Sequence, residues 1–193
     1  WSAHPMLAVT PTMRFLIPDH LDVRVEVSKH GWLGEYLTRH AWPRSRDNDG
    51  NPIDLSVVGP ASQDHIDKLF STRLQEGWGA VFDEKSEDYL AFTFSPDAIP
   101  FVGVCAIRGR WPTDDDNTLI GLIEPCNGWP DRLDVAIDRG EHQTVPPLGR
   151  LSWNLELTIG RGRAGLDEVI HGAPATTLTF DRRNVTPAGI DGR

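Results

Sequence analysis

The chain has little cysteine, little positive charge and no long hydrophobic run, and each shortage excludes a class of protein. Two cysteines among 193 residues are too few for a disulfide-stapled secreted scaffold, and no CxxC or HExxH pattern predicts a metal site. The formal net charge is −9, which argues against proteins that bind nucleic-acid phosphates or anionic membrane surfaces. No apolar run approaches the roughly 18 residues that a membrane-spanning helix needs.

The two cysteines, Cys105 and Cys126, lie inside apolar, strand-like runs. Buried free thiols are typical of reducing compartments, so we expect two reduced cysteines and a cytoplasmic protein; a single disulfide between them is the alternative. The chain begins at Trp1, within a segment that reads as the middle of a strand. We therefore expect it to be part of a longer protein.

Alternating apolar and polar residues predict an all-β fold. Residues 21–27 place leucine and valine on one face and charged residues on the other, which is typical of a half-buried antiparallel strand. Residues 149–159 show the same alternation, residues 79–94 read as a hairpin around a polar turn, and residues 101–108 are rich in strand-forming side chains. About eight or nine short strands at regular spacing indicate a β-sandwich.

The remaining segments predict few other elements. Residues 131–140 have apolar side chains at helical spacing and predict one short helix. Residues 38–64 are polar and contain several prolines, which predicts a long surface excursion with little regular structure. We expect a sandwich domain over residues 1–160 and a tail over residues 161–193, with a possible extra strand at 176–180.

The most informative stretch is LIGLIEPCNGWP, residues 119–130, in which an apolar run ends on an acid. In an extended strand Ile120, Leu122 and Glu124 share one face. Pro125 favours an extended backbone at Glu124, and a carboxylate at the end of an apolar stripe is costly unless something binds or uses it. A fixed, partly desolvated carboxylate is suited to act as a general base. The alternative is an edge-strand glutamate at a turn.

His4 is a second titratable residue that a following proline holds extended. It lies in the apolar segment WSAHPMLAVT, directly before Pro5. The residues alone leave two interpretations open. One is a titratable group in a site, and the more common one is a structural histidine that is hydrogen-bonded within the fold.

Four segments occur in an order that carries a family resemblance: WSAHPML, VGVCAIRGRWP, LIGLIEPCNGWPDRLDVAIDRG and PPLGRLSWNLELTI. Together they resemble the aldose 1-epimerase (galactose mutarotase-like) family, and more closely its bacterial relatives with an EPC motif. The resemblance covers residues 1–159 and matches the central and C-terminal parts of such proteins. It implies a galactose mutarotase-like β-sandwich, or supersandwich, that is incomplete at its N-terminus.

The resemblance also implies an activity. Members of the family interconvert the α and β anomers of a small-molecule sugar through ring opening, with no metal or organic cofactor. Glu124 falls where the family has its general base for the anomeric hydroxyl, and His4 falls where a family histidine protonates the ring oxygen. Each positioned proton-transfer group of this kind contributes about 10²–10⁴-fold to a rate.

The resemblance leaves other parts of the site open. Trp129 and Trp111 lie in loops close to the two motifs, where their rings either stack on a sugar or pack in the core or rim. We expect the family's arginine and its second histidine to lie upstream of Trp1, so neither is assigned to a residue here. The aspartate that holds sugar hydroxyls has none that is convincing, with Asp64 and Asp67 the nearest candidates.

Three alternatives to a free-sugar epimerase follow from the sequence. A hexose-6-phosphate epimerase would need an arginine cluster, whereas Arg108 and Arg110 are the only paired arginines near the motifs. A non-catalytic carbohydrate-binding protein could use the same sandwich, because fold does not determine function. The third is a partial chain whose site is incomplete.

Overall fold

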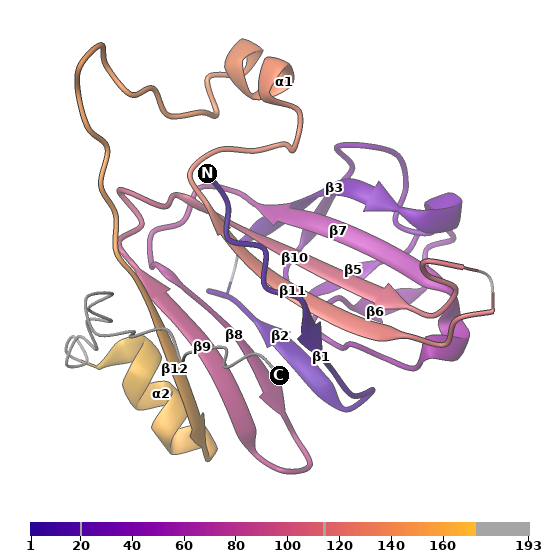
Figure 1. The fold of residues 1–193 in the computed structure, drawn as a ribbon. Helices are drawn as coiled ribbons and strands as arrows, with labels where there is room; N and C mark the ends of the chain where they lie inside the picture. The colour runs from indigo at the N-terminus through magenta and orange to yellow at the C-terminus, as the bar shows by residue number, and fades with distance from the viewer. Residues whose placement is uncertain (20, 114, 173–193) are drawn as a thin grey trace, which may run out of the picture.

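The computed structural model describes residues 1–19, 21–113 and 115–172, which contain two packed antiparallel sheets (Figure 1). The larger sheet contains, in spatial order, β1 (Leu7–Ala8), β11 (Leu119–Cys126), β10 (Phe101–Arg108), β7 (His65–Ser71), β3 (Asp22–Ser28) and β4 (Arg39–Ala41). The smaller sheet contains β12 (Leu155–Arg161), β9 (Asp88–Phe94), β8 (Trp78–Asp83) and β2 (Met13–Leu16). A separate hairpin pairs β5 (Arg44–Arg46) with β6 (Pro52–Asp54).

Two α-helices and two short 3₁₀ turns accompany the sheets. The helices are α1 (Leu133–Asp138) and α2 (Arg163–His171), and the turns are η1 (Lys29–Gly31) and η2 (Ala61–Gln63). Residues 127–153, which carry α1, extend from the end of β11 beyond the sheets before the chain enters β12 (Figure 1). None of the helices within the described residues is long and apolar enough to cross a bilayer.

The main core lies between the two sheets, because alternate side chains of a strand point to opposite faces. The larger sheet contributes Val104 and Ile123, and the smaller sheet contributes Val81 and Phe92, all of them buried. Phe15 of β2 is fully buried among them. We call the face of the larger sheet that is turned away from this core the outer face.

Several sequence predictions are confirmed. The all-β character is present, the alternating residues 21–27 lie in β3, and the hairpin predicted at 79–94 is formed by β8 and β9. The strand predicted at 101–108 is β10. The helix predicted at 131–140 is shorter, since α1 spans six residues, and Gly140 follows it with a positive φ of 67°.

The strand β12 overlaps only the second half of the predicted range 149–159 and ends two residues beyond it, and part of its apolar face is not covered. Leu157 is 50% exposed and Ile159 is 74% exposed. Both lie on a strand at the edge of the smaller sheet, which has a neighbour on one side only. Leu155, nearer the start of the strand, does pack against the main core. Periodicity thus identified the strand but not its place at an edge.

The prediction of a single helix was wrong, because residues 163–171 form α2 instead of the irregular start of a tail. Leu166 is fully buried and packs with Phe82 and Tyr89 of the smaller sheet. Val169 and Ile170 pack against the same cluster. Their i, i+3, i+4 spacing with Leu166 is the signal for an amphipathic helix. The possible strand at 176–180 lies outside the described residues.

The surface excursion at 38–64 has more regular structure than expected. It contains the three-residue strands β4, β5 and β6, and β4 extends the larger sheet by pairing with β3. Such short strands are held by partners distant in sequence, so local composition does not reveal them.

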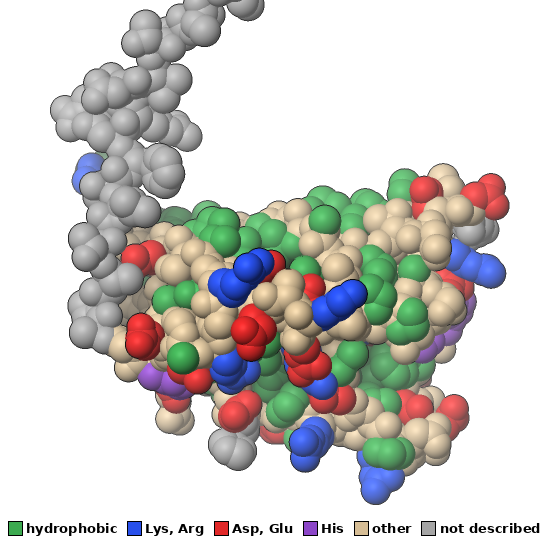
Figure 2. Space-filling view, turned by 90° about the horizontal axis from the view of Figure 1, so that it is seen from below, with side chains coloured by type: hydrophobic (Ala, Val, Ile, Leu, Met, Phe, Trp, Pro, Cys, Tyr) green, Lys and Arg blue, Asp and Glu red, His purple; other side chains and the backbone are tan. Residues whose placement is uncertain are grey.

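The charges on the surface are mixed. Figure 2 shows one face of the molecule, on which acidic and basic side chains lie among hydrophobic and other side chains without an extended patch of one sign. This face therefore presents no basic stripe of the kind that follows a nucleic-acid backbone.

Candidate functional site

Glu124 lies on the outer face of the larger sheet, as the alternation along β11 requires. Ile123 belongs to the main core, so its two neighbours in the strand point the other way. Leu122 packs with Cys105 in a separate cluster, and Ile120 packs against that cluster. The prediction that Ile120, Leu122 and Glu124 share one face is confirmed.

The Glu124 side chain is almost fully buried, with 2% of its surface exposed. Its Oε2 atom forms an ion pair with Lys68, whose Nζ atom is 3.0 Å away. Its Oε1 atom accepts no hydrogen bond from any described residue. The nearest basic group on that side is His4, whose Nε2 atom is 3.6 Å from Oε1 and whose side chain is 58% exposed. The structure therefore brings the two predicted site residues together.

Lys68 of β7 is a member of this site that the sequence did not indicate. Its side chain is only 11% exposed, and its Nζ atom also contacts both carboxylate oxygens of Asp131, at 2.9 and 3.1 Å. Burial lowers the pKa of Lys68, but the hydrogen bond to Asp131 and the charge of Glu124 outweigh it, so the net shift is upward. Lys68 is therefore protonated at neutral pH.

A glycine between two strands allows this arrangement. Gly103 of β10 lies in register between Glu124 of β11 and Phe70 of β7. A Cβ atom at Gly103 would be 2.9 Å from the Phe70 ring and 3.1 Å from the Glu124 Cβ. Because no side chain stands there, the Phe70 ring and Glu124 fit on either side of Gly103. Lys68 lies 5.3 Å from the centre of the Phe70 ring and reaches Glu124.

A pocket of about 280 Å³ shares Asp131 with this group, whereas Glu124, His4 and Lys68 are not among the residues that line it. It lies between the start of the chain, the outer face and the segment that carries α1. Asp131 lines it and shares Lys68 with Glu124. Gln143 also lines it and has a buried Oε1 atom without a hydrogen-bond partner among the described residues. The pocket thus offers oxygen acceptors to a small polar ligand. Other lining residues are Phe70, Cys126, Asn127 and His142.

The Trp129 ring is packed inside the protein and is not exposed to solvent. It is fully buried, and its ring stacks with Phe70 at a centroid distance of 5.7 Å. The guanidinium carbons of Arg24 and Arg139 lie 4.6 and 5.1 Å from its ring centre. With its surroundings filled by protein groups, Trp129 has no surface on which a sugar could stack. Trp129 therefore packs within the protein, and the prediction that its ring stacks on a sugar was wrong.

Trp111 lies far from Glu124. It follows β10 in the loop that leads to β11, where Arg108 pairs with Leu119. Glu124 is five residues further along β11, or roughly 17 Å at the usual rise per strand residue. Trp111 is 37% exposed. The hairpin therefore places it at the opposite end from the predicted site, and its assignment to the sugar site is also corrected.

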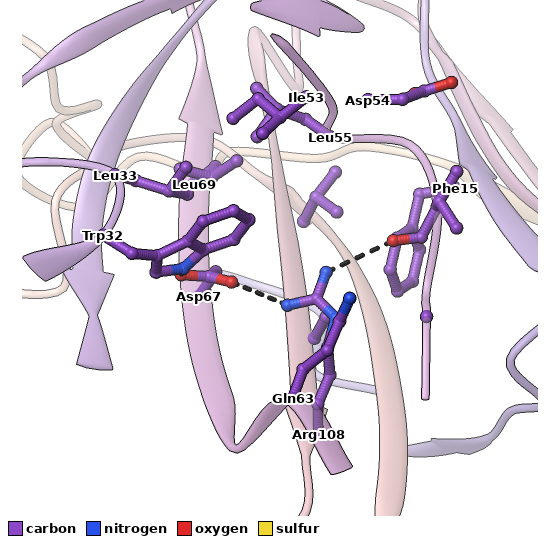
Figure 3. Close-up of a pocket in the computed structure, with 14 residues that line it drawn as sticks. Phe15, Trp32, Leu33, Ile53, Asp54, Leu55, Gln63, Asp67, Leu69 and Arg108 are labelled. Carbon is purple, nitrogen blue, oxygen red and sulfur yellow. Dashed lines mark hydrogen bonds and ion pairs between the residues drawn. The ribbon is translucent and has the colours of Figure 1, made fainter. Parts of the chain in front are cut away.

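A second pocket, of about 150 Å³, lies next to the main core and contains a buried ion pair (Figure 3). Arg108 Nη1 donates to Asp67 Oδ2 at 2.6 Å, and Trp32 Nε1 donates to Asp67 Oδ1 at 2.6 Å. Arg108 also donates to the carbonyl oxygens of Val57, at 3.2 Å, and Val58. Burial raises the pKa of Asp67, although Arg108 acts in the opposite direction. Because both oxygens of Asp67 are bonded, we interpret this network as a structural tie.

The other acidic and basic candidates lie away from Glu124. Asp67 is on the core side of β7, and Lys68 is on the outer side. Asp64 is bound by Lys29 at 2.5 Å and lies 3.5 Å from Arg110. The hydroxyl-binding aspartate suggested by the resemblance therefore has no counterpart at either position beside Glu124.

The remaining candidate groups are the two thiols and the possible metal ligands. Cys105 and Cys126 are free and buried, which confirms the expectation of two unpaired thiols. Over residues 1–19, 21–113 and 115–172, no three His, Cys, Asp or Glu side chains are grouped so that they could hold a metal ion. No family model, curated protein or solved structure matches this chain.

Proposed function

We propose that the chain is an aldose 1-epimerase-like isomerase, a mutarotase built on a galactose mutarotase-like β-sandwich. One observation carries the proposal: a buried carboxylate keeps one oxygen without a hydrogen bond, and that oxygen faces an exposed imidazole 3.6 Å away. The ordered motifs around Glu124 and His4 support the same assignment, because they resemble those of the family. General acid–base catalysis needs two such groups, close together and able to exchange protons with one substrate.

The proposed reaction moves two protons and breaks one ring bond. Glu124 Oε1 takes the proton of the anomeric hydroxyl while protonated His4 gives a proton to the ring oxygen. The electron pair of the bond between C1 and the ring oxygen goes to that oxygen, and an open-chain aldehyde forms. Rotation about the C1–C2 bond then exposes the other face of the aldehyde. Ring closure with the proton transfers reversed gives the second anomer and restores both side chains.

The pocket beside Glu124 is the proposed substrate site. Asp131 and Gln143 offer oxygen atoms that can accept hydrogen bonds from sugar hydroxyls. A site with several acceptors and one lysine that is already paired with two carboxylates suits an uncharged, polyhydroxylated ligand. We therefore place a free aldose first among the candidate substrates.

Polarimetry tests the proposal directly. Freshly dissolved α-glucose and α-galactose should lose their excess optical rotation faster with the full chain than in buffer alone. Heat-denatured protein at the same concentration is the control for buffer and trace catalysts. If micromolar folded protein accelerates neither sugar, the proposed activity is wrong for these substrates.

One observation favours a second candidate, a hexose-6-phosphate epimerase. Arg24 lies in the same row of the outer face as Glu124, with Phe70 and Gly103 between them. Three strand spacings put their Cα atoms roughly 14 Å apart, which leaves room for a sugar between the side chains. Glu141 accepts hydrogen bonds from Arg24 at 2.9 and 3.3 Å and offsets its charge, so this candidate comes second.

The same measurement separates the candidates. A phosphate-specific enzyme should accelerate α-glucose 6-phosphate more than α-glucose, and Arg24→Gln should remove that preference. A carbohydrate-binding protein without activity would show saturable ligand-induced shifts in NMR spectra and no acceleration. The free-sugar proposal predicts acceleration of α-glucose that Arg24→Gln leaves within a few-fold.

A further inference from the structure

The group around Glu124 contains one cation that the proposed reaction does not use. Lys68 is held by β7, two strands away from Glu124, and its ammonium reaches across the outer face to both Glu124 and Asp131. We infer that Lys68 is the positioning residue of this site: it fixes the Glu124 carboxylate through Oε2 so that Oε1 stays free and directed at His4. The catalytic part of this inference rests on the proposed function, whereas the charge coupling between Lys68 and Glu124 does not.

The two carboxylate oxygens of Glu124 have different surroundings. Oε2 is 3.0 Å from the Lys68 ammonium, and Oε1 is left without a hydrogen bond although it is buried. The two oxygens of a carboxylate are equivalent, so a half-turn about its last bond restores the same arrangement. The ion pair opposes the intermediate angles, because they would carry the nearer oxygen away from the ammonium. The free acceptor therefore keeps a defined direction, toward His4.

Lys68 is itself held from the other side. Asp131, which precedes α1, binds the ammonium through both oxygens, and the face of the Phe70 ring lies beneath it. An ammonium has three donors and no preferred plane, so it can serve two carboxylates that approach from different directions. Asp131 thus prevents Lys68 from turning into solvent and keeps it available to Glu124.

A purely structural ion pair would show the same distances, and its loss would also make Glu124 easier to protonate, because an ion pair that adds stability lowers the pKa of its carboxylate. A titration therefore tests the charge coupling, and the rate tests the positioning. If Lys68 only adds stability, its removal leaves kcat unchanged at a pH where Glu124 is ionised in both chains, whereas the loss of a positioning residue lowers kcat at that pH and changes KM less. The titratable groups that face Glu124 from the surrounding elements are His4, Lys68, Cys105 and Cys126, and Asp131 and Glu26 act on Lys68 from the far side.

The experiment is a ¹³C NMR titration of the Glu124 carboxyl carbon in the full chain, assigned with Glu124→Gln. Lys68→Met keeps the length of the side chain and removes the charge. We expect it to raise the midpoint of the Glu124 titration by about one pH unit or more. Lys68→Arg keeps the charge and should stay within about half a unit of the unmodified chain. Asp134→Asn is the matched control, because it removes an exposed carboxylate whose partner is Arg132 and leaves Lys68 and Asp131 in place; it should not raise the midpoint.

An unchanged Glu124 midpoint in Lys68→Met overturns the inference, whatever happens to stability. Should Lys68→Met not fold, Lys68→Gln removes the charge while its amide can still donate to Glu124, and the same shift is expected. In the mutarotation assay the acid limb of the kcat/KM profile should move to higher pH together with the titration, with KM changed less than kcat. A moved midpoint in a chain that accelerates no sugar supports the charge coupling and rejects the proposed activity, so the two failures are distinguishable.

Discussion

The protein buries two carboxylate–cation pairs on opposite faces of the same sheet, and they differ in one respect. Asp67 and Glu124 are 4% and 1% exposed, and each is paired with a basic side chain, Arg108 or Lys68. Both oxygens of Asp67 accept hydrogen bonds from described side chains. Glu124 has one oxygen in an ion pair and one without a partner.

The difference shows why burial of charge does not by itself mark a site. A buried pair with every acceptor used is consistent with a structural role, and it strongly resists disruption. A buried acceptor without a partner is costly, so it calls for an explanation such as a bound water or a ligand. In this molecule that acceptor lies next to an exposed histidine, where a substrate could supply the missing hydrogen. The following predictions test this distinction between the two pairs.

The largest effect is expected from Glu124→Gln. The amide keeps the size of the side chain but cannot accept the anomeric proton, so mutarotation should fall by about 10³-fold or more. Glu141→Gln is the control, because Glu141 is also paired with a basic side chain, Arg24, but has no assigned proton transfer. Polarimetry on α-galactose measures both. Activity that survives in Glu124→Gln would remove Glu124 as the base.

The thiols test whether the outer face is as closed to solvent as the core. Burial raises the pKa of Cys105, and likewise that of Cys126, from 9.0 to about 12. The thiolate fraction at pH 8 should therefore be about 10³-fold below that of an ordinary cysteine, and reaction with a thiol reagent correspondingly slow. Because the folded pKa exceeds the unfolded one, the contribution to stability is full below pH 9 and is lost as the pH rises toward 12.

Absorbance assays with a disulfide reagent at pH 8, with and without denaturant, measure the difference. Rapid reaction of either thiol in the folded protein would show that the outer face opens. Stability that stays constant or increases as the pH rises from 9 toward 12 would contradict the sign given above.

Asp67→Asn should damage the fold and spare the reaction. It leaves the Arg108 guanidinium buried without a counter-charge, which we expect to lower the free energy of unfolding by about 3–5 kcal/mol. Asp88→Asn breaks an exposed pair with Arg161, which solvent screens, and should lower the free energy of unfolding far less than Asp67→Asn does. Urea denaturation measures both variants. A small loss in Asp67→Asn, or a loss of activity in its folded fraction, would erase the distinction between the two buried pairs.

Two histidines allow a matched comparison at the surface. His4 lies 3.6 Å from Glu124 and is 58% exposed, and His30 lies 3.5 Å from Asp64 and is 61% exposed. We expect His4→Asn to reduce mutarotation about 10²-fold, because it removes the group that protonates the ring oxygen. His30→Asn should have no effect on the rate. Equal rates in the two variants would exclude His4 as the acid.

The smallest effect is expected from Trp111→Ala. The ring is partly exposed and lies at the end of the β10–β11 hairpin that is remote from Glu124. Its removal should change kcat/KM by no more than about two-fold and stability by about 0.5 kcal/mol or less. A marked increase in KM would restore Trp111 to the substrate site and revise the position of the pocket.

The sequence correctly predicted the strand face on which Glu124 lies, and it said little about the residues that surround Glu124 and His4. The alternation along 119–126 and the prolines after both residues are local features, and local features set backbone direction and side-chain face. The sequence did not indicate Lys68, because residues 65–71 do not alternate between apolar and polar side chains. Asp67 points to the core and Lys68 to the outer face, so a charge occurs on each side and the period of two is hidden.

The predictions that two tryptophans stack on a sugar were wrong for a related reason. Trp111 and Trp129 are close in sequence to site motifs. The β10–β11 hairpin places Trp111 at the end remote from Glu124, and Phe70 packs against Trp129. Helix α2 was missed although Leu166, Val169 and Ile170 have helical spacing, because its neighbouring glycines favoured an irregular link. Its stability comes from packing on Phe82 and Tyr89, which lie about 80 residues earlier in the chain.

By itself, the sequence determined which segments are extended, which side chains share a face and that Glu124 ends an apolar stripe. These properties depend on neighbours within a few residues, so they can be read from the chain. Only the tertiary structure decided that Lys68 forms an ion pair with one oxygen of Glu124 and that His4 faces the other. Those contacts depend on the register of three strands and on the missing side chain at Gly103, which lets groups from distant parts of the sequence meet.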